Sequence, residues 1–350
     1  MDRTTIHAQS RDIKIVSWNV HGIMRASEGL KTQDKCFADL INSHKIFCLQ
    51  ETKREIFVPN YRCINKTRNG SKSGGLCVGI HRSLSDGIVQ LNTRSDDILA
   101  VRLTTDSSGI TPPLFIINIY DSPEASSFKK RKKTEQSLST MDQLLEFFST
   151  GIITQQDRVL LTGDFNARTG SLNHNPCFQT DRFDFAGNAA AHDPSGPVNS
   201  SERASQDKTL NPRGKLLMDL LACTDMSLLN GCTLGDAMGE YTCQTYNGTS
   251  VVDYTAVSYN LQRLVDSFRI LDMTDLSDHR PCSISLNIRN SNINADILLD
   301  AMQSAPVKYK WDADNPEIGK VFREGLLTEK IKETSNKILR INCTNDKDVF

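Results

Sequence analysis

Short runs of apolar, β-branched residues recur along this chain, and each run ends on polar side chains. Ile13–Val20, Ile46–Gln50 and Arg158–Thr162 have the length and composition of strands rather than helices. The polar sequences at the ends of such runs are Trp18-Asn19, Gln50-Glu51-Thr52, Asn118-Ile119-Tyr120, Gly163-Asp164-Phe165-Asn166, Val252-Asp253-Tyr254 and Ser277-Asp278-His279. Strand ends that each supply polar side chains are typical of a site built on the rim of a sheet.

Helical segments separate some strands, whereas other strands follow one another directly. Thr32–Ser43, Leu138–Phe148 and Arg213–Thr224 carry apolar residues at helical spacing. Further strands are predicted at Leu76–His81, Leu99–Thr104, Leu114–Tyr120, Ser227–Asn230, Tyr241–Thr245, Val251–Val257, Phe268–Leu271 and Cys282–Ile288. This mixture predicts an α+β fold in which two packed mixed sheets are covered by helices.

The character of the chain changes after Asn290, which predicts one domain over residues 10–290. Residues 291–350 are predicted to form a helical, charged tail or linker. Inside the domain, residues 167–212 are polar and lack periodicity, and loops of that length are usually functional or disordered.

Charge and hydropathy exclude several classes of partner. The net charge is -1, so nucleic acid would have to be held by a local patch. The basic run Lys129–Lys133 has three readings: a phosphate-backbone contact, a nuclear-localisation patch, or a solvated helix start. No apolar stretch approaches the roughly 20 residues of a membrane helix, and the N-terminus lacks a signal core. We therefore expect an intracellular protein, nuclear or cytoplasmic, with no membrane partner.

The ten cysteines show no paired Cys-x-x-Cys spacing, which indicates a reducing compartment. Cys36, Cys48, Cys77 and Cys223 fall in apolar segments and are predicted to be small core residues.

Three of the polar strand ends suit a metal site. Glu51 is a hard oxygen ligand of the kind Mg²⁺ prefers. Asn19 could orient Glu51 or a metal-bound water, and Asp278 adds another carboxylate.

The other strand ends suit phosphate chemistry. Asp164 and Asn166 are two residues apart, so in an extended segment they point to the same side. Asp253 near His279 would keep the imidazole protonated and able to stabilise a negative transition state. Tyr120 offers a phenol donor to a phosphate oxygen.

Each of these residues also has a purely structural interpretation. Asp164 could be a turn residue, Glu51 a solvated strand end, and Asn19 a turn cap. Six such groups in this order favour a metal-assisted phosphodiesterase over coincidence.

The motifs, in this order, resemble the exonuclease-endonuclease-phosphatase superfamily, in the apurinic-endonuclease-like class found in non-LTR (LINE-type) retrotransposons. The resemblance runs from about Ile13 to Ile288 and implies a four-layer, DNase I-like α/β sandwich. It implies catalytic roles for Asp164, His279, Asp253, Asn166 and Tyr120, metal roles for Glu51, Asn19 and Asp278, and substrate-binding roles for Thr242 and Asn230. Arg68 and Lys72, beside the Gly74-Gly75 turn, are read as phosphate contacts.

The activity implied by the resemblance is Mg²⁺-dependent nicking of DNA, with Mn²⁺ as a substitute, to leave a 3′-hydroxyl that primes reverse transcription. Tyr309–Asp312 resembles the segment leading toward a reverse transcriptase, whose Tyr-x-Asp-Asp motif is absent from the sequence. We therefore expect a fragment, a truncated copy or a domesticated remnant. The oligomeric state is not predicted.

One departure from the family pattern follows Tyr120. Related nucleases place an Asn shortly after this tyrosine, in a Tyr-x-Pro-Asn turn, whereas this chain reads Tyr120-Asp121-Ser122-Pro123-Glu124. One phosphate contact is therefore in question.

Two alternatives remain open from the sequence. A lipid or inositol phosphatase of the same superfamily is disfavoured, because Ser250–Tyr254 stands where the Pro-Ala-Trp-Cys-Asp-Arg signature is expected. A catalytically inactive DNA-binding module is disfavoured because Glu51, Asp164, Asp253 and His279 are all intact.

Overall fold

A computed structural model describes residues 11–25, 29–68, 73–105, 110–123, 138–173 and 203–288. All of them lie in one compact unit that ends at Ser291. Two six-stranded mixed sheets form its centre, which confirms the predicted α+β sandwich. No helix in these ranges is both long and apolar enough to cross a membrane. The predictions for Lys72, Lys129–Lys133 and the 291–350 tail lie outside the described residues.

The first sheet has the strand order β15-β16-β1-β4-β6-β5. Its strands are β1 (Arg11–Asn19), β4 (Ile46–Gln50), β5 (Tyr61–Lys66), β6 (Leu76–His81), β15 (Val265–Ile270) and β16 (Cys282–Ile288). β1 runs parallel to β4, with Asn19 opposite Gln50, and antiparallel to β16. This register sets Asn19 next to the residue that precedes Glu51.

The second sheet has the order β11-β14-β10-β9-β8-β7. Its strands are β7 (Ile88–Leu91), β8 (Ile98–Thr105), β9 (Ile110–Tyr120), β10 (Arg158–Asp164), β11 (Met226–Leu228) and β14 (Asp253–Ser258). Asp164 at the end of β10 lies between Tyr120 on β9 and Asp253 on β14. The register of this sheet therefore brings three predicted site residues to one edge.

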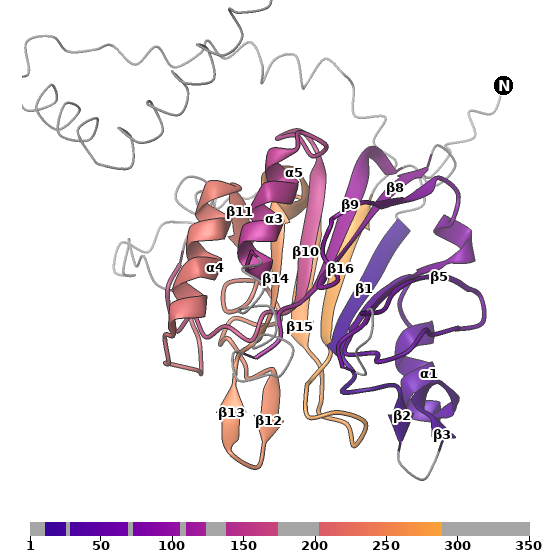
Figure 1. The fold of residues 1–350 in the computed structure, drawn as a ribbon, viewed down its shortest axis with the longest axis horizontal. Helices are drawn as coiled ribbons and strands as arrows, with labels where there is room; N and C mark the ends of the chain where they lie inside the picture. The colour runs from indigo at the N-terminus through magenta and orange to yellow at the C-terminus, as the bar shows by residue number, and fades with distance from the viewer. Residues whose placement is uncertain are drawn as a thin grey trace, which may run out of the picture. The chain divides into compact units, whose positions relative to one another are not determined.

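Helices cover the outer face of each sheet. The helices are α1 (Lys35–Asn42), α3 (Thr140–Ser149), α4 (Pro212–Cys223) and the short α5 (Tyr259–Gln262). Figure 1 shows α3 and α4 beside the second sheet and α1 on the opposite side of the sandwich. Local sequence sets where α1 and α4 begin: Asp34 and Asn211 each accept backbone N–H groups at the first turn.

Four small strands and two 3₁₀ turns complete the described part. They are β2 (Met24–Arg25), β3 (Gly29–Leu30), β12 (Cys243–Thr245), β13 (Gly248–Ser250), and the turns Lys31–Gln33 and Arg82–Leu84. β12 and β13 form a hairpin that projects beyond the two main sheets (Figure 1).

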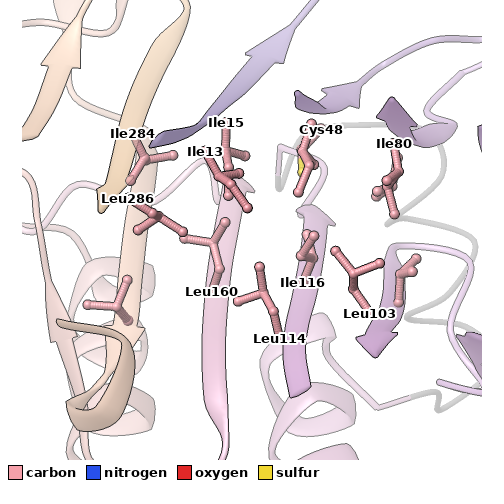
Figure 2. Close-up of a cluster of buried hydrophobic side chains, with 14 of the residues drawn as sticks. Ile13, Ile15, Cys48, Ile80, Leu103, Leu114, Ile116, Leu160, Ile284 and Leu286 are labelled. Carbon is pink, nitrogen blue, oxygen red and sulfur yellow. The ribbon is translucent and has the colours of Figure 1, made fainter. Parts of the chain in front are cut away.

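The main core lies between the two sheets. Ile13, Ile15 and Ile284 from the first sheet face Leu160 and Ile116 from the second (Figure 2). Burying one such side chain contributes roughly 1.5–3 kcal/mol. Two further clusters fill the layers between each sheet and its helices. The apolar runs are thus buried on both faces, which explains why they are nearly continuous in the sequence.

Some sequence predictions were incomplete or wrong. Strands β5 and β7 were not predicted; both are edge strands, and they lack a regular alternation of buried apolar and exposed polar residues. Cys48 and Cys77 are buried as predicted, but Cys36 and Cys223 are exposed. Both exposed cysteines lie on helices, where neighbouring apolar residues in sequence point to different faces.

Candidate active site

Loop and strand ends from both sheets converge at one end of the sandwich. Asn19 ends β1 and Glu51 follows β4, while Asp164 and Asp253 come from the second sheet. His279 lies in the segment between β15 and β16. A glycine permits the close approach at the centre: Gly163 has a φ of 141°, and a Cβ there would lie 2.0 Å from the Ile119 carbonyl oxygen.

Asp164 is the most enclosed carboxylate of the group. Its side chain accepts hydrogen bonds from Asn19 Nδ2 at 2.8 Å, from the Asn166 backbone N–H at 2.9 Å and from Asn166 Nδ2 at 3.1 Å. Burial, and then the charge of Asp253, raise the pKa of Asp164 to about 7, against the opposing effect of His279. Amide donors alone therefore leave this carboxylate's charge under-compensated.

Glu51 lies on the other side of the same asparagine. Asn19 Nδ2 is 3.2 Å from Glu51 Oε1, so one amide links the carboxylates of Glu51 and Asp164. Glu51 has a left-handed φ of 53°, and its carbonyl accepts from Gly22 N–H at 2.7 Å. The Lys53 ammonium is 3.7 Å from Glu51 Oε2. The two carboxylates offer hard oxygen ligands, which fit Mg²⁺ or Mn²⁺.

His279 forms the opposite half of the site. Its Nδ1 lies 2.8 Å and 3.0 Å from the two oxygens of Asp253. Burial acts to lower the pKa of His279, but the charge and hydrogen bond of Asp253 outweigh it, so the pKa lies well above 6.5. The backbone of His279 is held on both sides. Trp18 Nε1 donates to the His279 carbonyl at 2.8 Å, and the His279 backbone N–H donates to Ser277 Oγ at 3.1 Å. His279 Nε2 is 4.0 Å from Asp164 Oδ2.

Thr242 and Asn230 support the backbone around Asp253. Thr242 Oγ1 accepts the N–H groups of Val252 and Asp253, both at 3.1 Å. Asn230 Nδ2 donates to the Asp253 carbonyl at 3.1 Å. Both side chains are fully buried, and their predicted substrate-binding roles stay predictions.

Tyr120 is buried at the end of β9. Burial, followed by the charges of Glu51 and Asp164 and a hydrogen bond with Glu51, raises the pKa of its phenol far above the ordinary value of 10. Tyr120 is therefore a neutral hydrogen-bond donor at any physiological pH.

Arg68 underlies Tyr120 instead of facing solvent. Its Nε donates to Asp97 Oδ1 at 2.7 Å and its Nη2 to Ser122 Oγ at 2.6 Å. Its guanidinium carbon lies 5.0 Å from the centre of the Tyr120 ring, and the residue is 4% exposed. Arg68 thus supports Tyr120 and the turn after it, and its predicted phosphate contact stays a prediction. On the other side of that turn, Arg213 pairs with Asp121.

Asp278 lies at the rim of the site. Its Oδ1 is 2.9 Å from His21 Nδ1, and that hydrogen bond lowers the pKa of Asp278 to about 2. His21 and the buried Lys31 were not predicted. Lys31 Nζ donates to the carbonyls of Val20 and Leu276, and so ties the Asn19 and Asp278 segments together. His21 could have been found from its position directly after Trp18-Asn19-Val20, whereas nothing in the sequence around Lys31 indicates its role.

Comparison with known proteins identifies the fold. The endonuclease-reverse transcriptase family matches residues 114–283. The endonuclease domain of TRAS1, a telomere-specific non-LTR retrotransposon, is 16% identical with a TM-score of 0.51, covering 79% of this chain and 99% of that domain. The AP endonuclease LMAP from Leishmania major is 14% identical with a TM-score of 0.54, covering 79% and 88%. A 3′-5′ exonuclease from Neisseria meningitidis is 16% identical with a TM-score of 0.51, covering 79% and 100%. No curated protein matches the chain.

Proposed function

We propose that this phosphodiester hydrolase, which resembles the endonuclease-reverse transcriptase family over residues 114–283, is a divalent-metal-dependent endonuclease that nicks DNA and leaves a 3′-hydroxyl. The observation that carries the proposal is the pairing of an under-compensated carboxylate, Asp164, with an imidazolium, His279, whose Nε2 is 4.0 Å away. A base and a cation at that separation can act on neighbouring atoms, the base on the attacking water and the cation on an oxygen of the same phosphate group.

Glu51 and Asn19 would hold the metal, with Mg²⁺ as the expected ion and Mn²⁺ as a substitute. When bound, such an ion polarises a phosphate oxygen and neutralises charge that develops on it. Asp278, which is hydrogen-bonded to His21, would add a carboxylate at the rim of the metal site.

Asp164 would accept the proton of the attacking water. Its three amide hydrogen bonds fix the orientation of the carboxylate. A pKa near 7 suits a general base at neutral pH. Asn166, which is hydrogen-bonded to Asp164, would contact the same phosphate.

His279 would donate from Nε2 to a phosphate oxygen as negative charge grows there. Asp253 holds Nδ1 and keeps the ring charged and oriented. Tyr120 would add a neutral phenol donor. These groups cost no reorganisation during the reaction, because buried neighbours already hold them in place.

DNA is the proposed substrate because the family match and the TRAS1 endonuclease domain both concern nucleases linked to retrotransposons. A 3′-hydroxyl left by the nick would serve as primer for a reverse transcriptase carried elsewhere in the element. A phosphatase acting on an inositol phosphate is the competing function.

Nicking of supercoiled plasmid tests the proposal. With Mg²⁺ the protein should convert plasmid to open circles, EDTA should stop the reaction, and a DNA polymerase should extend the nicks without prior phosphatase treatment. Glu51→Gln should abolish nicking, whereas Glu55→Gln, at an exposed neighbouring carboxylate, should not. Release of phosphate from inositol phosphates without nicking, or DNA binding without nicking, would overturn the proposal.

A further inference from the structure

A buried thiol touches the imidazole of the site and has no part in the proposed hydrolysis. Cys243 Sγ lies 3.6 Å from His279 Nε2, the ring nitrogen that would face the phosphate. Cys243 is 8% exposed and lies on β12. The backbone holds the pair together: Cys243 and His279 form a β-bridge, and the Gln244 N–H donates to the Asp278 carbonyl at 2.8 Å.

We propose that Cys243, His279 and Asp278 form a second cation site, selective for Zn²⁺ or a similarly thiophilic ion, whose occupation inhibits the enzyme. One ligand atom from each residue lies within 4.8 Å of the others. Thiolate, imidazole and carboxylate are the ligands that Zn²⁺ takes, whereas Mg²⁺ takes oxygen ligands and avoids sulfur. The site is thus chemically distinct from the one at Glu51 and Asn19.

The distance between the sulfur and the nitrogen matches this assignment. A tetrahedral Zn²⁺ with a Zn–S bond of about 2.3 Å and a Zn–N bond of about 2.05 Å separates the two ligand atoms by about 3.6 Å. The separation between Cys243 Sγ and His279 Nε2 is 3.6 Å. These two ligands therefore need no rearrangement, and Zn²⁺ binding would release two protons to solvent, one from the Cys243 thiol and one from His279 Nε2.

The surroundings of His279 also favour Nε2 as the atom that would bind the metal. Zinc-binding histidines usually donate their second ring N–H to a carboxylate, which fixes the ring orientation. Here Asp253 Oδ2 lies 2.8 Å from Nδ1, which leaves Nε2 directed at Cys243. Asp278 would contribute the third ligand and a water molecule the fourth. To bind the ion, Asp278 would give up its hydrogen bond with His21.

Inhibition follows from which atom the ion would occupy. An ion on Nε2 removes the donor that the proposed mechanism directs at the phosphate. This consequence rests on the proposed function, whereas binding of the ion does not.

Binding is tested with the full chain in a non-chelating reductant and excess Mg²⁺. Titration with Co²⁺ should produce a near-ultraviolet thiolate-to-metal absorption band, which added Zn²⁺ should abolish. Cys243→Ser should lack the band. Cys232→Ser, at a half-buried thiol whose Sγ lies against backbone carbonyls of residues 228–230, should keep it. An equal band from Cys243→Ser would overturn the site.

Inhibition is tested by titrating Zn²⁺ into the plasmid-nicking reaction, with each variant normalised to its own zinc-free rate. Cys243→Ser should need at least tenfold more Zn²⁺ for half-inhibition than the wild type or Cys232→Ser. Equal sensitivity of all three would overturn the inhibitory role. If the wild type does not nick DNA at all, the proposed function fails, and the Co²⁺ band still decides whether the cation site exists.

Discussion

The two halves of the site are both buried, but their charges are compensated in different ways. Asp164 receives three amide hydrogen bonds, and its pKa is raised to about 7. Asp253 faces an imidazole at 2.8 Å, whose own pKa is raised in return. The Asp253–His279 half is thus a self-sufficient ion pair. The Asp164 half, with Glu51 beside it, has negative charge without a matching positive group, which a bound cation would supply.

The difference follows from where each partner comes from. Asp164 and Asp253 are opposite each other in one sheet, so their side chains share one end of that sheet. His279 enters from the segment before β16, and Asn19 and Glu51 enter from the first sheet. Each carboxylate is therefore compensated across the interface between the sheets, one by an imidazole and the other by an amide.

Removal of the Asp164 half should have the largest effect. Asp164→Ala deletes the proposed base, and we expect the nicking rate to fall about 10³-fold or more, since base catalysis and charge stabilisation are lost together. Plasmid nicking under saturating Mg²⁺ measures the rate, and a gel-shift assay checks that DNA binding persists. Asp272→Ala, at an exposed aspartate, is the matched control. Equal rates for both variants would remove Asp164 from the mechanism.

The ion-pair half should respond less strongly and with a pH signature. We expect His279→Ala to lower the nicking rate about 10²–10³-fold. Asp253→Asn keeps a hydrogen-bonding side chain but removes the charge that raises the pKa of His279 above 6.5. The imidazole should then lose its proton as pH rises through the neutral range, so nicking by this variant should decline between pH 6 and 8 relative to wild type. Parallel pH profiles would contradict the assigned role of Asp253.

A third experiment distinguishes the Asp164 half from the Asp253–His279 half by the pH dependence of protein stability. The folded pKa of Asp164 lies above its ordinary 3.8, at about 7, so the folded state binds this proton more tightly than the unfolded state does. Its contribution to stability is present below pH 3.8 and is lost as pH rises to about 7. In metal-free protein at pH 8, Asp164→Asn should therefore raise Tm by on the order of 5 °C, with a smaller gain at pH 5. Calorimetric melting measures this, and a gain independent of pH would contradict it.

The smallest effect is expected from the support beneath Tyr120. Arg68→Lys keeps a positive charge but cannot hold Asp97 and Ser122 with one planar group. We expect kcat to fall about tenfold or less, with KM for DNA nearly unchanged. Arg62→Lys, at an exposed position of β5, is the control. A rise in KM with constant kcat would instead make Arg68 a DNA contact.

Sequence reasoning identified the catalytic candidates because most of them follow a recognisable strand. Asn19, Glu51, Tyr120 and Asp164 end or follow apolar strands, whereas Asp253 begins one, and the structure brings all five together with His279. It could not separate residues that would touch the substrate from residues that support them. Thr242, Asn230 and Arg68 are predicted to bind the substrate, and the structure adds that all three are buried and hydrogen-bonded to other protein groups.

The sequence by itself determined most of the strands, the main helices, most of the polar strand ends and the chemical character of the site, because apolar periodicity and residue chemistry are local properties. Only the tertiary structure decided which ionisable groups lie close enough to change one another's pKa values. The pairing of β10 with β14 places Asp164 opposite Asp253, and the approach of β12 places Cys243 against His279. Burial and distance set pKa values and metal preference, and neither quantity is encoded in any single segment of the chain.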